Sequence, residues 1–123
     1  MKTNRHYSFI DQLCLNADGA LRAVFGKAET TGRTNPSASE KEPILTAEER
    51  KHAAGLMRVN HTGEVCAQAL YHAQGMISKN KTMKDKMRHA AIEEGDHLNW
   101  CSDRLTELSS HTSYLNPIWY AGS

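Results

Sequence analysis

The sequence lacks three features that would assign it to common classes of protein. No run of about 18 apolar residues occurs, and the first residues lack the apolar core of a secretory signal, so we expect neither a membrane span nor export. Lys and Arg number 15 against 14 Asp and Glu, and a net charge of +1 is too small to predict a nucleic-acid partner. Cys14, Cys66 and Cys101 form no CxxC pair, which excludes zinc-knuckle spacing and favours reduced thiols in a cytosolic setting.

Alternating strand patterns are absent as well, and the periodicity that is present is helical. Ser8 and Asp11 have capping-box spacing, so residues 1–26 are expected to form an N-terminal amphipathic helix. The apolar positions that share one face of this helix are Phe9, Leu13, Ala17, Ala20, Leu21 and Val24. Residues 27–45 are polar, contain two prolines and show no periodicity, which predicts a linker that contributes nothing to a core.

The remaining residues, 46–123, contain two long helical segments. Thr46 and Glu49 have capping-box spacing at the start of a helix that continues to about Ser78. Thr82 and Asp85 repeat that spacing and predict a second helix to about Ser109, followed by the loop SSHTSYLNP. Two long helices joined by a short turn are expected to pack antiparallel, so the fold class is all-α.

Metal-binding chemistry is indicated on the apolar face of the second helix. The residues within about 60° of Glu94 at 100° per residue are Met83, Met87, Ala90, Ala91, His97, Leu98, Cys101, Leu105 and Leu108. Glu94 and His97 are the polar members of this stripe, and burying them costs several kcal/mol unless a partner compensates. Because residues i and i+3 share a helix face, the Glu-x-x-His pair can converge on one metal ion, as in di-iron four-helix bundles.

The first long helix supplies a third candidate ligand, Glu64, at mid-length. Asn60 and Gln68 lie one turn on either side of it on the same face, where they would either hydrogen-bond the metal ligands or meet water, and Tyr71 has the same two alternatives. His61 precedes Glu64 by three residues. A helix-edge position is the favoured interpretation for His61, and a contact with the metal ligands is the alternative.

Interpretations without metal are also open. A Glu-x-x-His pair is common at helix edges, and the motif gains weight here only from its place in an apolar stripe. Glu93 lies off the stripe and is expected to be solvated. The histidines without a partner at ligand spacing are expected at the surface, and these are His6, His52, His72, His89 and His111.

Three segments resemble the demethoxyubiquinone hydroxylase family of ubiquinone biosynthesis. They are RVNHTGEVCAQALYHAQ (58–74), EEGDHLNWCSDRL (93–105) and NPIWYAGS (116–123), and the opening YSFIDQLCLNADGALRAVFG is similar to the bacterial members. The resemblance implies a ferritin-like di-iron four-helix bundle, of which this chain supplies a leading helix and the first helical hairpin. It also implies a monooxygenase that uses dioxygen to hydroxylate a demethoxylated polyprenyl quinol.

By motif position, the resemblance implies that Glu64, Glu94 and His97 ligate iron, with two irons in a complete site and no catalytic side chain beyond the ligands. Such proteins carry a second half with another Glu and another Glu-x-x-His, so we expect this chain to be inactive as an isolated half. It is then either a truncated form of a longer enzyme or one copy of an isologous dimer that completes the site. The electron donor is not legible from the residues, and NADH and the quinol itself are both open.

A lipid-embedded quinol predicts peripheral contact with the cytoplasmic side of the cell membrane. The N-terminal amphipathic helix and the pair Trp119 and Tyr120 are candidates for that contact, with ordinary packing of the same residues as the alternative. Two other functions share part of the pattern. A metal-free helical interaction module would use Glu94 and His97 to pair with a charged partner, and a ferritin-type iron-binding protein would share the ligands but lack a quinol pocket.

Overall fold

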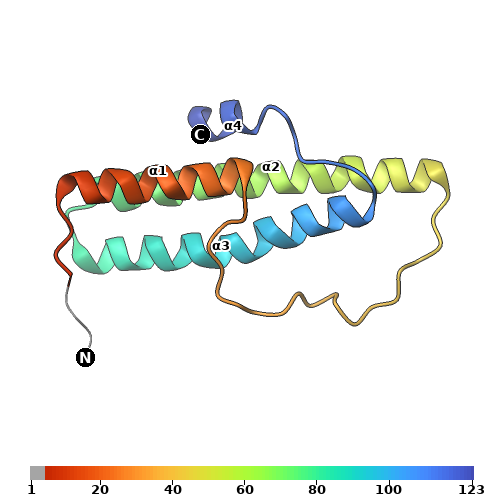
Figure 1. Cartoon of the computed structure of the whole chain (residues 1–123), viewed down its shortest axis with the longest axis horizontal. Helices are drawn as coiled ribbons and strands as arrows, with labels where there is room; N and C mark the ends of the chain where they lie inside the picture. The colour runs from red at the N-terminus through yellow and green to blue at the C-terminus, as the bar shows by residue number, and fades with distance from the viewer. Residues whose placement is uncertain (1–4) are drawn as a thin grey trace.

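The computed structural model describes residues 5–123 and folds them into helices and connecting segments, with no strand in this part of the chain. The helices are α1 (Phe9–Phe25), α2 (Ala47–Ile77), α3 (Lys81–Glu107) and α4 (Asn116–Gly122). Figure 1 shows α2 and α3 as an antiparallel hairpin, with α1 lying along α2 and the short α4 beside α2. The all-α fold class is therefore confirmed, although residues 1–4 of the predicted N-terminal segment lie outside the described residues.

Two of the three predicted helix starts are confirmed by their caps. The Ser8 hydroxyl accepts from the Asp11 amide at 3.1 Å while the Asp11 carboxylate accepts from the Ser8 amide at 2.8 Å, which is a complete capping box. Thr46 and Glu49 make the same reciprocal pair at the start of α2. These local hydrogen bonds satisfy amides that have no partner in the first turn, which explains why spacing alone located both helices.

The predicted cap of α3 was wrong. Asn80 caps this helix, because its side-chain oxygen accepts from the amides of Thr82 at 2.9 Å and Met83 at 3.3 Å, and Thr82 is already helical. Asn is a better N-cap than Thr, so the helix starts after Asn80 although Thr82, two residues later, is also a possible N-cap. α3 also ends earlier than predicted, at Glu107, where Ser109 adopts a positive φ of 57° and closes the helix.

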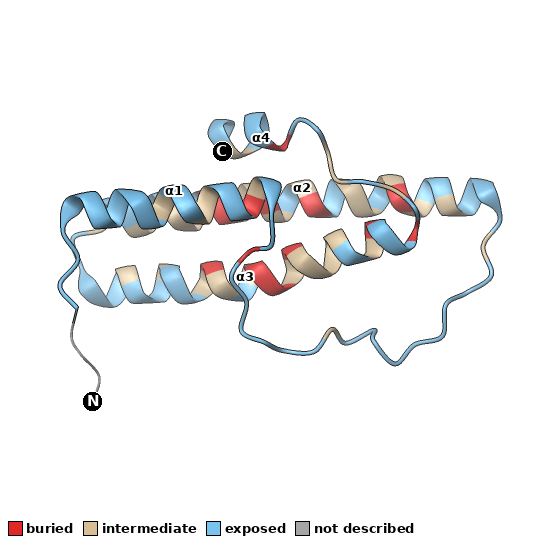
Figure 2. Ribbon diagram, in the orientation of Figure 1, coloured by how far each residue is buried: buried red, intermediate tan, exposed pale blue. Residues whose placement is uncertain are grey.

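The connection between α1 and α2 contributes to the core, contrary to the prediction for residues 27–45. Ala28 is buried and packs in one cluster with Ala23, Val65 and Leu98, so it joins α1, α2 and α3. We call residues 27–31 the strap. The rest of the connection is almost entirely exposed, as its pale colour in Figure 2 shows.

Hydrogen bonds fasten the strap to one side of α3. Asn99 accepts from the Ala28 amide at 3.1 Å and donates to the Ala28 carbonyl at 3.0 Å. The Asp96 carboxylate accepts from the Thr31 amide at 2.9 Å and from the Thr31 hydroxyl at 2.5 Å. Asp96 is buried, and these two bonds compensate for the removal of its carboxylate from water. Neither Asp96 nor Asn99 belongs to the predicted stripe, so α3 buries a second face.

The predicted stripe is buried only in its central and C-terminal parts. Leu98, Leu105 and Leu108 are nearly inaccessible, and Ala91 is buried with them. Leu105 and Leu108 pack with residues of α2 in a second core cluster. Met83 is exposed, because the first turns of α3 lie beyond the part of the hairpin that the core covers.

A candidate metal centre in the helical hairpin

The hairpin brings the three predicted ligands to one point. Glu64 comes from the middle of α2, and Glu94 and His97 come from the middle of α3. Each offers one ligand atom, and these atoms all lie within 4.8 Å of one another. All three side chains are half-buried. Convergence of the three residues was the central geometric prediction, and the structure has it.

Glu94 and His97 contact each other, and both lie close to Glu64. His97 Nδ1 lies 3.3 Å from a Glu94 carboxylate oxygen, as the i, i+3 spacing on one helix allows. The Trp100 ring lies beside the His97 ring, with centroids 5.5 Å apart. Arg33, from the connection before α2, lies over the Trp100 ring at 5.1 Å. The cationic neighbour was not predicted, because Arg33 comes from a segment 67 residues before Trp100, whereas Trp100 is only three residues from His97 on α3 and its helical spacing could have indicated the contact.

The surroundings of Glu64 disfavour a state in which Glu64 and Glu94 are both ionised. Burial raises the pKa of Glu64 to about 8, and a hydrogen bond with Glu94 and repulsion from its charge act in the same direction. Glu64 therefore keeps its proton at neutral pH in the metal-free fold. Burial and the Glu64 charge also raise the pKa of the Cys101 thiol, so Cys101 is not an activated thiolate.

The donor set fits an iron ion. Two carboxylates and one imidazole, half-buried and within 4.8 Å of one another, are the ligand types found in di-iron bundles. A cation held by both carboxylates would reverse the repulsion that raises the pKa of Glu64, because it would favour the charged form of each. The residues present thus suit a metal better than they suit an empty packing seam.

Two polar neighbours of Glu64 on α2 behave differently from each other. Gln68 is buried and its side-chain amide donates to the Ala91 carbonyl of α3 at 2.7 Å, a backbone partner that neither alternative for this residue included. Asn60 is exposed. Tyr71 is half-buried and lines a groove beyond Gln68.

The favoured helix-edge position of His61 was wrong. His61 is 3 % exposed, and its Nδ1 lies 3.3 Å from the side-chain amide of Asn116, the first residue of α4. Burial lowers the pKa of His61 to about 4, so the ring is neutral at physiological pH. This partner was not predicted, because Asn116 falls in the segment SSHTSYLNP that was expected to be a loop, and it begins a seven-residue helix instead.

His72 also departs from its predicted surface position. Its Nδ1 lies 2.7 Å from the Tyr120 hydroxyl of α4, and burial lowers the pKa of the ring. The other four histidines are exposed as predicted, namely His6, His52, His89 and His111. Glu93 is likewise exposed and pairs with His89 at 3.3 Å on the outer face of α3.

The fold and the site together define an all-helical protein in which a hairpin gathers a Glu, Glu and His cluster of the kind that binds iron. A family model described as "Ubiquinone biosynthesis protein COQ7" matches residues 51–123. The chain therefore belongs to the COQ7 family. The matched region contains all three candidate ligands.

Curated relatives extend the likeness over nearly the whole chain. A 3-demethoxyubiquinol 3-hydroxylase of Acinetobacter baumannii is 57% identical over 116 residues, which are 94% of this chain and 54% of the relative. Proteins of the same name from Chromohalobacter salexigens and Coxiella burnetii are 52% and 50% identical, over 98% of this chain and 56% and 55% of their own lengths. The chain thus spans about half the length of the curated relatives it matches. No solved structure matches the chain.

Proposed function

We propose that Glu64, Glu94 and His97 are ligands of a di-iron centre, and that the protein containing this chain hydroxylates a demethoxylated polyprenyl quinol. The observation that carries the proposal is the convergence of two carboxylates and one imidazole within 4.8 Å, inside the region that the family model covers. The curated relatives named 3-demethoxyubiquinol 3-hydroxylase support the choice of substrate.

The chain's own residues would hold the metal and shield the reaction. Glu64 would give up its proton to a bound metal, so that both carboxylates could hold it as anions and His97 could supply a nitrogen. Bound iron supplies the activation of dioxygen and the oxidising power for hydroxylation. Leu98 and Ala91, buried on either side of Glu94 along α3, exclude water from the inner side of the site.

Three ligands are half of the set that two irons require in this kind of bundle. We propose that residues 46–123 form the first half of a ferritin-like bundle, with residues 5–26 as a leading amphipathic helix. The remaining ligands would come from a second half like that of the longer relatives. A second copy of this chain, paired about a two-fold axis, is the alternative source.

We also propose a source of electrons and a cellular location for the reaction. Electrons would come from NADH or from the quinol, and the quinol tail would require peripheral contact with the cytoplasmic side of the cell membrane. In the described part of the chain, no helix is both long and apolar enough to cross a bilayer. α1 instead exposes large apolar side chains, among them Phe9, Ile10 and Phe25, each about 70 % accessible.

Iron content tests the ligand assignment. The full-length protein, reconstituted anaerobically with ferrous iron, should lose most of its bound iron on Glu94→Ala or His97→Ala substitution, because each change removes one of the three donors that this chain supplies. Glu93→Ala is the matched control, since it removes a neighbouring carboxylate that lies on the outer face of α3. Iron retained by both ligand variants as well as by the control would refute the assignment.

The metal-free interaction module keeps one observation in its favour, the 3.3 Å contact between Glu94 and His97, which can form without an ion. It predicts no iron in any variant, so the same measurement separates it from the proposal. A ferritin-type iron-binding protein predicts iron without quinol hydroxylation. Turnover of a short-tailed demethoxylated quinol by the full-length protein, measured by product mass, separates these two.

Membrane contact needs a separate test. Flotation of the chain with liposomes should weaken when residues 1–26 are removed, if exposed apolar side chains of α1 enter the interface. A change of Phe9 and Phe25 to Ser in the intact chain is the milder variant, because both side chains are exposed and their loss costs little packing. Equal flotation of all forms would eliminate α1 as the membrane contact.

A further inference from the structure

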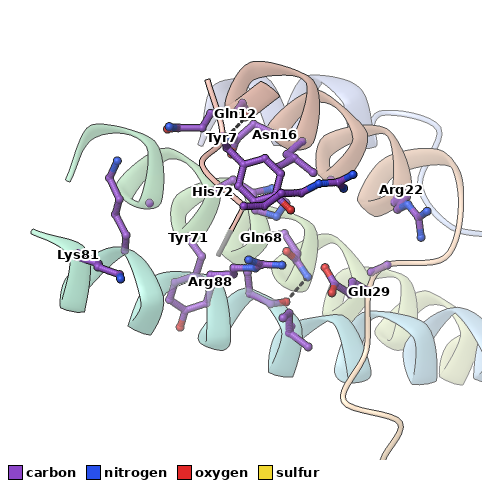
Figure 3. A pocket seen from close by; sticks show the side chains of 18 of the residues that line it. Tyr7, Gln12, Asn16, Arg22, Glu29, Gln68, Tyr71, His72, Lys81 and Arg88 are labelled. Carbon is purple, nitrogen blue, oxygen red and sulfur yellow. Dashed lines mark hydrogen bonds between the residues drawn. The ribbon is translucent and has the colours of Figure 1, made fainter. Parts of the chain in front are cut away.

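A large groove lies among α1, α2 and α3, next to the proposed metal centre. Its volume is about 880 Å³, which is enough for a ligand the size of a nucleotide. Figure 3 shows Gln68, His72 and Arg88 around its middle, with Lys81 and Arg22 toward opposite ends. Neither Glu64, Glu94 nor His97 lines it, so the groove is distinct from the candidate metal centre.

The lining of this groove is strongly cationic in a chain that is almost neutral overall. Five basic residues line it, namely Arg5, Arg22, Lys81, Lys84 and Arg88, whereas Glu29 is the one acidic lining residue. The whole chain has 15 basic against 14 acidic residues, so this excess is local. Within residues 5–123, Arg22 has a carboxylate partner, Asp18 at 3.0 Å, but the other four cations have none within 4.0 Å.

Three of these cations form a stripe that weakens the helix carrying it. Lys81, Lys84 and Arg88 have spacings of three and four residues, so they share one face of α3, where Asp85 offsets only part of their mutual repulsion. The first turn of α3 has no acidic residue, and Lys81 and Lys84 lie there against the positive end of the helix dipole. A helix selected for stability alone would have the opposite charges at this end, and an anion in the groove would relieve both effects.

We propose that this groove binds a phosphate-bearing ligand. Arg88 and Arg22 offer planar forks that can bind phosphate oxygens bidentately, and the lysines add point charges. Tyr7, Tyr71 and Ile92 also line the groove and provide apolar and aromatic surface for the group that carries the phosphate. The phosphate belongs either to a soluble nucleotide-like molecule or to a lipid headgroup at the membrane surface.

The position of the groove gives this ligand a specific relation to the metal centre. Gln68 and Ala91 both line the groove and are joined by a 2.7 Å hydrogen bond from α2 to α3, about one helical turn from Glu64 and Glu94 respectively. Arg88 precedes Glu94 by six residues, which is about 9 Å along a helix axis. A phosphate held by Arg88 would therefore anchor its molecule within reach of the iron site, without contacting the ligands themselves.

Calorimetric titration of the full chain with inorganic pyrophosphate, without added metal, tests the proposal. We expect a Kd of about 1 mM or lower. Lys84→Gln with Arg88→Gln should weaken binding by about tenfold, whereas the matched control, Lys51→Gln with Lys86→Gln, removes the same charge from exposed positions outside the groove and should change binding less than about twofold. Equal weakening by both pairs would overturn the proposal, because the effect would then be one of net charge.

Weaker binding by the Lys84 and Arg88 variant would also result from misfolding, so a second variant is chosen that should bind pyrophosphate more tightly. Glu29→Gln removes the acidic lining residue and should tighten pyrophosphate binding by about threefold, with no loss of helix content. Co-sedimentation with phosphatidylcholine vesicles containing one-fifth phosphatidylglycerol provides the second arm. Dependence of vesicle binding on Lys84 and Arg88, without pyrophosphate binding, assigns the phosphate to a lipid headgroup. Absence of binding in both arms would overturn the proposal.

Discussion

Gly95 lies in the middle of α3, directly beneath the backbone of the strap. A Cβ added at this position would be 1.9 Å from the carbonyl oxygen of Glu29 and 3.4 Å from the Ala28 side chain. The first distance is far inside van der Waals contact, and the obstructing atom belongs to backbone that cannot simply rotate away. Gly95→Ala should therefore displace the strap from α3, although alanine is the better helix former.

The size of the effect follows from what the strap contributes. Four hydrogen bonds of its attachment, two between Ala28 and Asn99 and two between Thr31 and Asp96, contribute about 1 kcal/mol each, whereas the exposed ion pair of Lys27 with Asp103 adds little. Burial of Ala28 adds about 1 kcal/mol. Helix propensity returns about 1 kcal/mol on replacing glycine by alanine. We expect a net loss of about 3 to 4 kcal/mol in the free energy of unfolding.

Urea denaturation followed by circular dichroism measures this loss, and Gly55→Ala is the matched control. Gly55 is also within a long helix, but a Cβ there meets nothing within 4 Å, so alanine should stabilise the fold by about 0.5 to 1 kcal/mol. Amide exchange at Ala28 and Thr31 should speed up in Gly95→Ala alone. If both alanine variants were more stable than the parent, the packing of the strap against α3 would be refuted.

Three further predictions concern buried polar contacts. Burial lowers the pKa of His61 from 6.5 to about 4, so between these pH values the unfolded chain binds a proton that the native chain does not bind. The free energy of unfolding should therefore fall by about 3 kcal/mol from pH 6.5 to pH 4. His61→Asn should flatten this pH dependence in urea titrations. Tyr120→Phe removes the hydroxyl 2.7 Å from His72 Nδ1 and should lower stability by about 1 kcal/mol, with faster amide exchange in α4 as the readout and unchanged exchange in α4 as the contrary result. Thr31→Val removes one of the two hydrogen bonds to buried Asp96 and should cost about 1 to 3 kcal/mol in the same denaturation assay, whereas a neutral effect would mean that water replaces the hydroxyl.

The parts of the fold that local chemistry determines could be predicted from the sequence. Capping boxes and apolar spacing act over three to seven residues, and they located α1, α2 and most of α3. The convergence of Glu64 on Glu94 and His97 followed from one additional step, the antiparallel packing of two long helices joined by a short turn. Each of these inferences needed only neighbours in sequence or in one hairpin.

The parts that depend on distant partners could not be predicted in this way. The strap has a polar, irregular sequence, and it is buried only because Gly95 leaves room for its backbone and Asp96 and Asn99 offer hydrogen bonds from about 65 to 71 residues away. The burial of His61 depends likewise on Asn116, 55 residues later. Periodicity describes one element at a time, so it cannot report which polar residues find partners on another.

The proposed metal centre and the cationic groove each gather ionisable groups of one sign, acidic in the first and basic in the second. Burial, a hydrogen bond with Glu94 and the Glu94 charge keep Glu64 protonated in the metal-free fold, and a cation between the two carboxylates would favour the ionised form of both. Lys81 and Arg88 belong to a stripe whose repulsion a bound anion would relieve in the same way. Clusters of like charge that weaken the unliganded fold are expected where a ligand is bound and not where packing alone is at stake. We therefore interpret α3 as a helix that serves two ligands of opposite charge, an anion near its start and a cation near its centre.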